Sequence, residues 1–371
     1  MSGQQRPGQQ HRVTFAMIAA EAGVSVPTVS RVVNGRADVA QQTRERVEHV
    51  LERRGYKRRG RRAKSSAGLL DLVFNDLDSP WAVEIIRGVE DVAHGESVGT
   101  VVSAIHRHTR SAMQWLQNVR ARNSDGVILV TSTLDQPVQA ELDRLAVPTV
   151  VVDPAGNQDL TVPVIGATNW AGGIRATEHL LSLGHRRIGA ITGPSRLRCS
   201  RARLDGYRSA LENAGIVVED ALIRAGDFHP ESGYDGAEAL LDQPVPPTAI
   251  FACSDQMALG VYESIRQRGL RVPDDISVVG FDDLPEAQWS SPPLTTVRQP
   301  LSDMGAMAAR IALRLSRSEP VDSPRVDLST ELVVRESTTS PANGHRLDDG
   351  AASNPETAES LSRDLATERR R

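Results

Sequence analysis

The sequence predicts an α/β protein: a small all-α domain followed by two doubly wound parallel-sheet lobes. From residue 14 to residue 56, apolar residues recur at spacings of three and four, which is the period of a helix. From Leu69 onward, short runs rich in Val and Ile alternate with amphipathic helical stretches, the pattern of right-handed βαβ units. Because about 270 residues are many for one such sheet, we expect two similar lobes.

Length and composition narrow the class of protein. The 371 residues are too many for one compact core and fit two or three domains. No run of eighteen apolar residues occurs, and residues 1–12 lack the apolar stretch of a secretory signal. Two cysteines, Cys199 and Cys253, are too few for a disulfide framework. We therefore expect a cytoplasmic protein with no membrane partner.

The net charge of −4 conceals an asymmetry. Residues 1–66 hold 14 Lys and Arg against 5 Asp and Glu, whereas the rest of the chain carries a net charge of −13. Six of the ten residues 55–64 are basic, which is too dense for an ordinary folded face. A basic amino-terminal segment on an acidic body indicates either a phosphate-binding head or a solvated basic tail.

Composition also sets the expected boundaries. Residues 1–12, rich in Gln, Gly and Arg, and residues 337–371, polar and poor in apolar side chains, are expected to be disordered. Between them we expect an all-α head over residues 13–56, a basic linker over residues 57–67 and the body over residues 68–336.

The head contains the signals of two helices joined by a tight turn. Thr14 can cap the first helix, and Gly23 can end it in the left-handed conformation that other residues adopt at a cost. Ser25 can cap the second helix by accepting from the Thr28 N–H. The first helix would bury Phe15, Ile18, Ala19 and Ala22; the second would bury Val29, Val32 and Val33; a third, over residues 41–54, would bury Val47, Val50 and Leu51.

In the body, the expected elements alternate. Strands are predicted over residues 69–74, 98–102, 126–130, 149–152, 188–191, 249–252 and 278–281. Helices are predicted over residues 81–93, 134–145, 172–183, 203–214, 232–241, 256–268 and 304–315.

The head motif AxxAGVSVPTVSRVVNG, followed by TRERVxxxLxxxGY, resembles the helix-turn-helix of the LacI/GalR family of bacterial transcriptional regulators. The resemblance places Val26 and Pro27 where that family reads base edges. It places Thr28, Ser30, Arg31 and Asn34 where the family contacts phosphates or bases. Arg31 is the strongest candidate, because a guanidinium can bridge a guanine edge or a phosphate; a solvated arginine is the alternative.

The linker departs from that family. Most members continue into a hinge helix that wedges a pair of leucines into the minor groove. Here the segment KRRGRRAKS has no leucine, and Gly60 disfavours a helix by about 1 kcal/mol relative to alanine. We expect four arginines to hold DNA by charge instead, favoured by the negative potential of a narrow minor groove: Arg58, Arg59, Arg61 and Arg62.

The body resembles the effector-binding core of the same family and periplasmic sugar-binding proteins. The motifs that carry this resemblance include IIRGVE, DGVILV, VPTVVVD, EHLLSLGHRRIGAITGP and SDQMALGVYESIRQRGLRVPDDISVVGFDD. With the head, the resemblance covers about 320 of 371 residues. It implies lobes of the periplasmic-binding-protein type, crossed three times by the chain, with the ligand in the cleft between them.

A sugar in that cleft requires carboxylates and guanidiniums for its hydroxyls and an aromatic face for its ring. Two criteria select the effector-binding candidates: a place at the end of a predicted strand, or a match to a position that binds effector in the family. The candidates are Trp81, Asp153, Asn169, Arg203, Phe228, Ser254 and Asp282. Each of these residues has an alternative role. Asp282, and Asp255 next to Ser254, could cap helices or form an internal ion pair. Arg203 could hold a crossover between lobes, and Phe228 could belong to the core.

Other chemistry has little support in the sequence. No dinucleotide fingerprint, phosphate-binding loop or nucleophile elbow occurs. His106 and His108 form the closest histidine pair and lack a third ligand. We therefore expect no catalytic residues, no metal and no cofactor.

Together these features predict a repressor, dimeric or tetrameric, that binds a palindromic operator in double-stranded DNA and responds to a small effector. The effector is expected to be a sugar, with a purine left open. One alternative is a cytosolic sugar-binding protein with a vestigial DNA-binding head. Another is an architectural DNA-binding protein whose body no longer binds a ligand.

Overall fold

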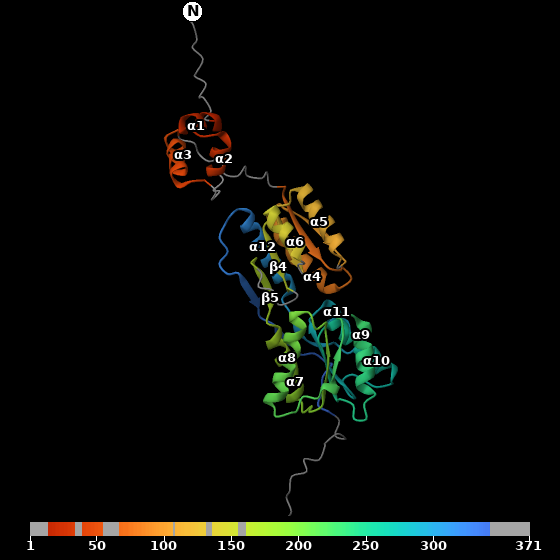
Figure 1. The fold of residues 1–371 in the computed structure, drawn as a ribbon. Coiled ribbons are helices and arrows are strands. Elements are labelled where there is room, and N and C mark those ends of the chain that lie inside the picture. Colours follow the sequence, from red (N-terminus) through yellow and green to blue (C-terminus); the bar gives the residue numbers. More distant parts are fainter. Residues whose placement is uncertain are drawn as a thin grey trace, which may run out of the picture. The chain divides into compact units, whose positions relative to one another are not determined.

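The computed structural model describes residues 14–33, 39–54, 67–106, 108–130, 136–154 and 161–341. The chain divides into two compact units, residues 1–66 and residues 67–371. The predicted disordered segment 1–12, linker residues 57–66 and tail residues 342–371 lie outside the described residues. Within the described part, the chain forms twelve α-helices and two six-stranded sheets (Figure 1).

The first unit is a three-helix domain made of α1 (Phe15–Ala22), α2 (Val26–Val33) and α3 (Gln41–Arg53). The predicted caps are confirmed. Thr14 Oγ1 accepts from the Met17 N–H at 3.4 Å, Ser25 Oγ accepts from the Thr28 N–H at 3.3 Å, and Gly23 ends α1 with φ 63°. The apolar stripes meet in a small core of Ile18, Ala19, Ala22, Val29, Val32, Val47 and Val50.

The second unit holds two lobes that share one design. Lobe 1 has the strand order β11-β5-β4-β3-β1-β2. Its strands are β1 (Leu69–Phe74), β2 (Gly99–Ala104), β3 (Gly126–Val130), β4 (Thr149–Val152), β5 (Val164–Ala167) and β11 (Arg325–Leu328). Its helices are α4 (Pro80–Gly95), α5 (Thr109–Arg122), α6 (Gln136–Leu145) and α12 (Leu301–Ser316).

Successive residues of the lobe 1 strands enter two different cores. Leu72 and Ile128 pack toward α4 and α12, whereas Val73 and Val127 pack toward α5 and α6. A sheet covered by helices on both faces explains why its central strands β3 and β4 are nearly continuous apolar runs rather than alternating ones.

Lobe 2 has the strand order β12-β10-β9-β8-β6-β7. Its strands are β6 (Ile188–Thr192), β7 (Ile223–Ala225), β8 (Ala249–Ala252), β9 (Ser277–Asp282), β10 (Thr295–Arg298) and β12 (Glu331–Val333). Its helices are α7 (Asn169–Ser182), α8 (Arg198–Asn213), α9 (Pro230–Leu241), α10 (Asp255–Gln267), the short α11 (Pro285–Trp289) and a 3-10 turn, η1 (Asp220–Leu222).

The chain crosses between the lobes three times: from β5 into α7, from β10 into α12 and from β11 into β12. Hydrogen bonds join the first crossing to the third. The Thr168 N–H donates to Leu328 O at 2.9 Å, and the Thr330 N–H donates to Thr168 Oγ1 at 2.9 Å.

The predicted parallel sheets are confirmed, with one exception at an edge. Strand β12 pairs antiparallel with β10, whereas every other pair is parallel within the described residues. All seven predicted strands and all seven predicted body helices are present, with boundaries shifted by a few residues. Five strands (β5, β7, β10, β11 and β12) and two helices (α5 and α11) were not predicted.

The predicted end of the body at residue 336 is too early, because residues 337–341 pack onto lobe 2. Ser337 is fully buried; its Oγ accepts from the Thr295 N–H at 2.8 Å and donates to Val278 O at 2.6 Å. The Thr339 N–H donates to Ser277 Oγ at 3.0 Å. Serine side chains hold this segment to β9 and β10 through hydrogen bonds, which composition alone does not reveal.

The helices of the described residues were compared with the length and apolar content that a bilayer requires. No single helix there is long and apolar enough to cross a bilayer. Only α1 and α2 taken together reach that length and composition, and they are bent by 104° to each other.

Candidate functional site

The exposed face of α2 is the first candidate site. Val26, Pro27 and Arg31 are exposed, and Val26 retains 43% of its surface. Thr28 and Ser30 are half-buried, and the Thr28 hydroxyl lies 2.8 Å from Ser25 Oγ. The outward orientation predicted for this helix is therefore present, although Thr28 also stabilises the start of α2.

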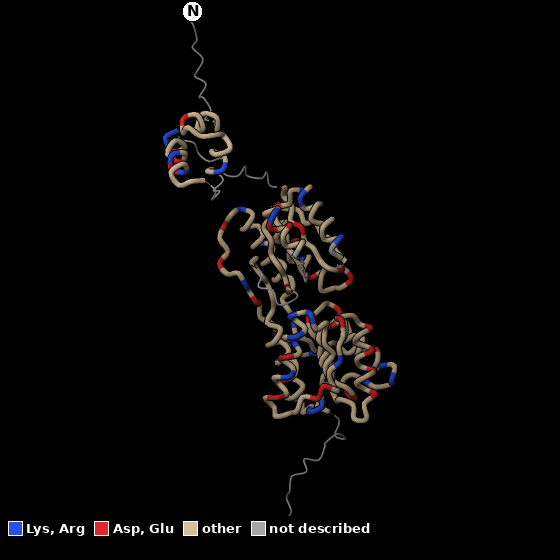
Figure 2. Tube along the Cα trace, viewed as in Figure 1, with Lys and Arg blue, Asp and Glu red and all other residues tan. Residues whose placement is uncertain are grey.

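The remaining predicted DNA contacts lie outside the described residues: Asn34, Arg58, Arg59, Arg61 and Arg62. The described part of the head carries five arginines and four glutamates (Figure 2). Two of those arginines, Arg53 and Arg54, pair with Glu21 and tie α3 to α1, with Arg54 Nε 2.6 Å from Glu21 Oε2. Most of the positive excess of residues 1–66 therefore belongs to the segments flanking the three helices.

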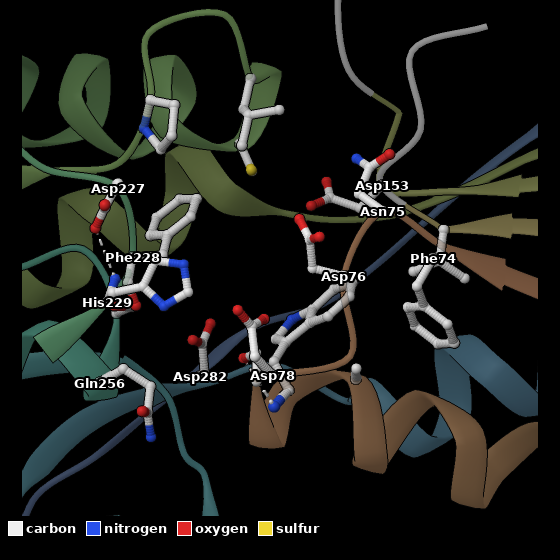
Figure 3. Close-up of a pocket in the computed structure, with 18 of the residues that line it drawn as sticks. Phe74, Asn75, Asp76, Asp78, Asp153, Asp227, Phe228, His229, Gln256 and Asp282 are labelled. Carbon is white, nitrogen blue, oxygen red and sulfur yellow. Dashed lines mark hydrogen bonds between the residues drawn. The ribbon is translucent and has the colours of Figure 1, made fainter. Parts of the chain in front are cut away.

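The second candidate site is a pocket between the two lobes, at the carboxyl ends of their strands, with a volume of about 140 Å³. Figure 3 shows Asp76 and Asp78 of lobe 1 facing Phe228, His229 and Asp282 of lobe 2. In open α/β sheets this edge is where ligands bind, because the strand-to-helix turns place side chains there.

Arg203 is the centre of a buried network beside this pocket and is 3% exposed. Its Nε donates to Asn169 Oδ1 at 2.8 Å, and its Nη1 donates to Cys253 O at 2.6 Å and lies 3.5 Å from Asp282 Oδ1. The guanidinium also stacks on the Phe281 ring, 3.8 Å from its centroid. Of the predicted alternatives, the ion pair of Asp282 and the crossover role of Arg203 are both present.

The network joins two of the three crossings. Asn169 begins α7 directly after the first crossing, and Gln299, in the second, donates from Nε2 to Asp282 Oδ1 at 2.6 Å. Helices α7 and α8 approach closely enough to position Arg203, because Gly173 has no side chain: a Cβ there would lie 2.3 Å from Arg203 O. We call the three crossings between the lobes the hinge; a ligand that contacts Arg203 or Asp282 touches two of them through this network.

Burial perturbs the carboxyl groups of this site. It raises the pKa of Asp153 and of Asp282 above the usual aspartate value, and the positive charge of Arg203 opposes both shifts. Perturbed carboxyl groups in a cleft are a common feature of binding sites.

Backbone strain gathers at the same pocket. Three predicted effector residues have φ in the left-handed region: Asp153 at 48°, Phe228 at 77° and Asp282 at 124°. Such conformations cost about 1–3 kcal/mol each, persist where the surrounding structure holds them in place, and cluster at binding and active sites. The Phe228 ring fits because Gly193 lies against it; a Cβ on Gly193 would lie 2.1 Å from Phe228 Cζ.

Six of the seven predicted effector residues line the pocket: Trp81, Asp153, Arg203, Phe228, Ser254 and Asp282. Asn169 does not line it; it orients Arg203 from behind and faces a neighbouring cavity. Asp255 does not line it either, because its carboxylate accepts from the Leu284 N–H at 2.8 Å and from Thr296 Oγ1 at 2.5 Å.

The prediction missed several polar residues of the pocket, in both lobes. Asp76 and Asp78 follow the first strand of the body, and Asp227, His229 and Gln256 flank residues that were predicted. The strand-end rule that selected Asp153 also applies to Asp76, so a signal for it was present. No group of three or more metal-ligating side chains occurs among the described residues; His106 Nδ1 lies 3.6 Å from Asp76 Oδ1.

Comparison with known proteins gives matches over both units. Residues 14–59 match the family "Bacterial regulatory proteins, lacI family", and residues 177–338 match a periplasmic binding protein-like domain. The HTH-type transcriptional repressor CytR of Escherichia coli K12 is 34% identical over 333 residues, which are 89% of this chain and 97% of the relative.

Solved structures agree with these matches. A complex of the transcriptional regulator CelR with cellobiose aligns with a TM-score of 0.69 and 34% identity, over 88% of this chain and 100% of that chain. The lac repressor dimer bound to operator aligns with a TM-score of 0.66 and 30% identity, over 88% of this chain and 99% of that chain.

Proposed function

Because the chain belongs to the LacI family of bacterial regulatory proteins, we propose that it is a transcriptional repressor whose operator affinity is controlled by an effector bound between its lobes. The observation that carries the proposal is the combination of an exposed α2 face with a strained, carboxylate-rich pocket joined to the hinge. It acts in the cytoplasm and is associated with the nucleoid when bound to its operator.

The DNA contacts follow from the geometry of a helix-turn-helix. Helix α2 enters the major groove, where Val26 and Pro27 make apolar contact, such as with a thymine methyl group. Arg31 reads a guanine edge or holds a phosphate. Thr28, Ser30 and Asn34 contact phosphates or bases and help to fix the position of α2 on the duplex. Arg58, Arg59, Arg61 and Arg62 add phosphate and minor-groove attraction.

The chemistry of the pocket favours an uncharged, hydroxyl-rich effector. Five aspartates line the pocket (Asp76, Asp78, Asp153, Asp227 and Asp282), against Arg196, Arg203 and His229. Carboxylates accept from sugar hydroxyls, whereas they repel a phosphate or carboxylate on a ligand. Phe228 and Trp81 supply aromatic faces for a ring. The relative solved with cellobiose supports a sugar over a purine.

Effector control requires that the two lobes close differently with and without ligand. An effector that touches Asp282 and Arg203 changes the contacts of Asn169 and Gln299, which belong to two crossings. Its differential affinity for the two lobe arrangements sets how far operator affinity shifts.

The active form is a homodimer, or a tetramer built from dimers, on a palindromic operator whose half-sites lie about one helical turn apart. Helix α12 is apolar but unsuited as a dimer surface, because it buries Met304, Ala308 and Ala312 in the core of lobe 1. Trp289 of α11 is a better candidate, since 85% of its surface is exposed.

The test is the affinity of the purified full chain for DNA upstream of its own gene, at several salt concentrations. Neutral mono- and oligosaccharides, sugar phosphates and purines are added in turn. We expect a specific complex whose affinity a neutral sugar changes by about 5–150-fold, and no response to sugar phosphates. Sugar binding without a specific DNA complex would indicate a vestigial head. DNA binding that no ligand changes would indicate a body that no longer senses.

The linker is tested separately. Replacing Arg58 and Arg61 by alanine should reduce the slope of log affinity against log salt by about 1–2 per head, because each phosphate contact contributes about 0.9. Arg266→Ala is the control, since Arg266 lies on lobe 2 and pairs with Glu263 at 2.7 Å. An unchanged slope in the double variant would show that the linker arginines do not hold DNA.

A further inference from the structure

A second cavity, of about 380 Å³, lies between the lobes beside the effector pocket. Lobe 1 lines it at the ends of β4, β5 and β11, and lobe 2 lines it with the first turns of α7 and α8. The two cavities share Asp153 and Cys199. Only Asp153 and Asn169 of this cavity were selected from the sequence, both as contacts of the first pocket.

The indole ring of Trp170 forms part of the wall of this cavity. Trp170, the second residue of α7, lines it and leaves 51% of its surface exposed. It belongs to none of the hydrophobic cores found among the described residues. A large indole held at the wall of a cavity offers a flat apolar face, which is the surface on which a sugar ring stacks.

Polar groups suited to hydroxyls surround that ring. Arg198 is half-buried and, among the residues the structure describes, forms no hydrogen bond or ion pair, so its donors are available. Asp327 is fixed by Arg325, whose Nε and Nη2 donate to its two oxygens at 2.9 and 3.1 Å. The formal charges of the cavity cancel, because Arg198 and Arg325 balance Asp153 and Asp327. A site without net charge suits a neutral ligand.

The second cavity is connected to the first by shared groups. Asp153 lines both, so one carboxylate can accept from hydroxyls on either side. Asn169, which lines the second cavity, accepts from the Arg203 guanidinium, which lines the first. A ligand that reaches from one cavity into the other therefore contacts the hinge network from both sides.

We propose that the second cavity binds a further sugar ring of the effector, so that the effector is a neutral oligosaccharide with one ring at Phe228 and another at Trp170. This inference rests on the proposed function and adds the size of the ligand and a second subsite. Trp170 and Arg198 are its specificity residues: the first stacks on the added ring, and the second donates to its hydroxyls.

The test is calorimetric titration of the full chain with glucose, cellobiose and cellotriose, and with maltose and maltotriose as a second series. We expect an oligosaccharide of one series to bind about tenfold or more tightly than glucose, with one ligand per chain. Trp170→Ala and Arg198→Ala should remove that gain and leave glucose affinity unchanged. Trp170→Phe should keep most of it. Arg208→Ala, on the same helix α8 as Arg198 but outside both cavities, should change nothing.

The outcomes separate the two proposals. If Phe228→Ala abolishes binding while Trp170→Ala and Arg198→Ala leave the oligosaccharide affinity intact, the second subsite is wrong and the sugar-controlled repressor stands. Two glucose molecules per chain, lost one at a time in the Phe228 and Trp170 variants, would overturn a single spanning effector. If no sugar of either series binds, the sugar effector itself fails and the subsite with it.

Discussion

Replacing Arg203 by methionine should abolish effector binding and lower the free energy of unfolding by about 3–5 kcal/mol. Methionine keeps much of the apolar volume beside Phe281 but removes the charge that faces Asp282. A buried carboxylate left without its partner is strongly destabilising, and Asp282 is only 5% exposed. Chemical denaturation and calorimetric titration of the same preparation measure the two effects.

A double variant distinguishes the structural role of Arg203 from its role in binding. Adding Asp282→Asn to Arg203→Met removes the unpaired charge and should recover most of the lost stability without restoring the effector response. Arg208→Met is the matched control: Arg208 lies on the same helix, 40% of its side chain is exposed, and its Nη1 lies 3.8 Å from Asp205 Oδ1. Such a solvated pair contributes at most about 1 kcal/mol. Recovery of both stability and effector response in the double variant would show that Arg203 only supports the fold.

Replacing Arg31 by alanine should weaken operator binding by about 1–3 kcal/mol per head, which for two heads is roughly 30-fold to 10⁴-fold. Arg31 is exposed on α2 and lies outside the head core, so the melting temperature of the variant should be close to that of the parent. Titration against the operator and against a scrambled duplex at one salt concentration gives the loss of affinity and of discrimination.

Arg46→Ala is the control for charge. Arg46 is exposed on α3 and belongs to the same small domain. Its removal should produce a smaller loss that is equal on both duplexes. If Arg31→Ala also weakens both duplexes equally, Arg31 holds a phosphate and base reading belongs to other side chains. If operator binding is unchanged, the placement of α2 in the major groove is wrong.

The head was the most predictable part of the chain, because its signals are local. Thr14, Gly23 and Ser25 act within three or four residues of themselves, and the buried stripe of each helix follows its period. The central strands of both lobes were predictable for a related reason: a strand buried on both faces is apolar over most of its length.

The strands that were missed are short, and most lie near the edges of the sheets. Strand β7 has three residues, and β11 alternates Arg, Val, Asp and Leu because it has a solvated side. Their existence depends on a partner strand: β11 pairs with β5, from which it is separated by most of lobe 2 in the sequence. Helix α5 had a usable signal in Ala112, Trp115, Leu116 and Val119, which are spaced as one helical face.

The sequence by itself determined the local elements, the separation of a DNA-binding head from a sensing body, and six of the residues that line the pocket. Only the tertiary structure decided that Asn169 supports Arg203 from outside the pocket and that Trp170 and Arg198 line a second cavity. The physical reason is distance along the chain. A cap or a helical period acts over a few residues, whereas a cleft forms where strand ends from two lobes meet, and no local pattern records which ends those will be.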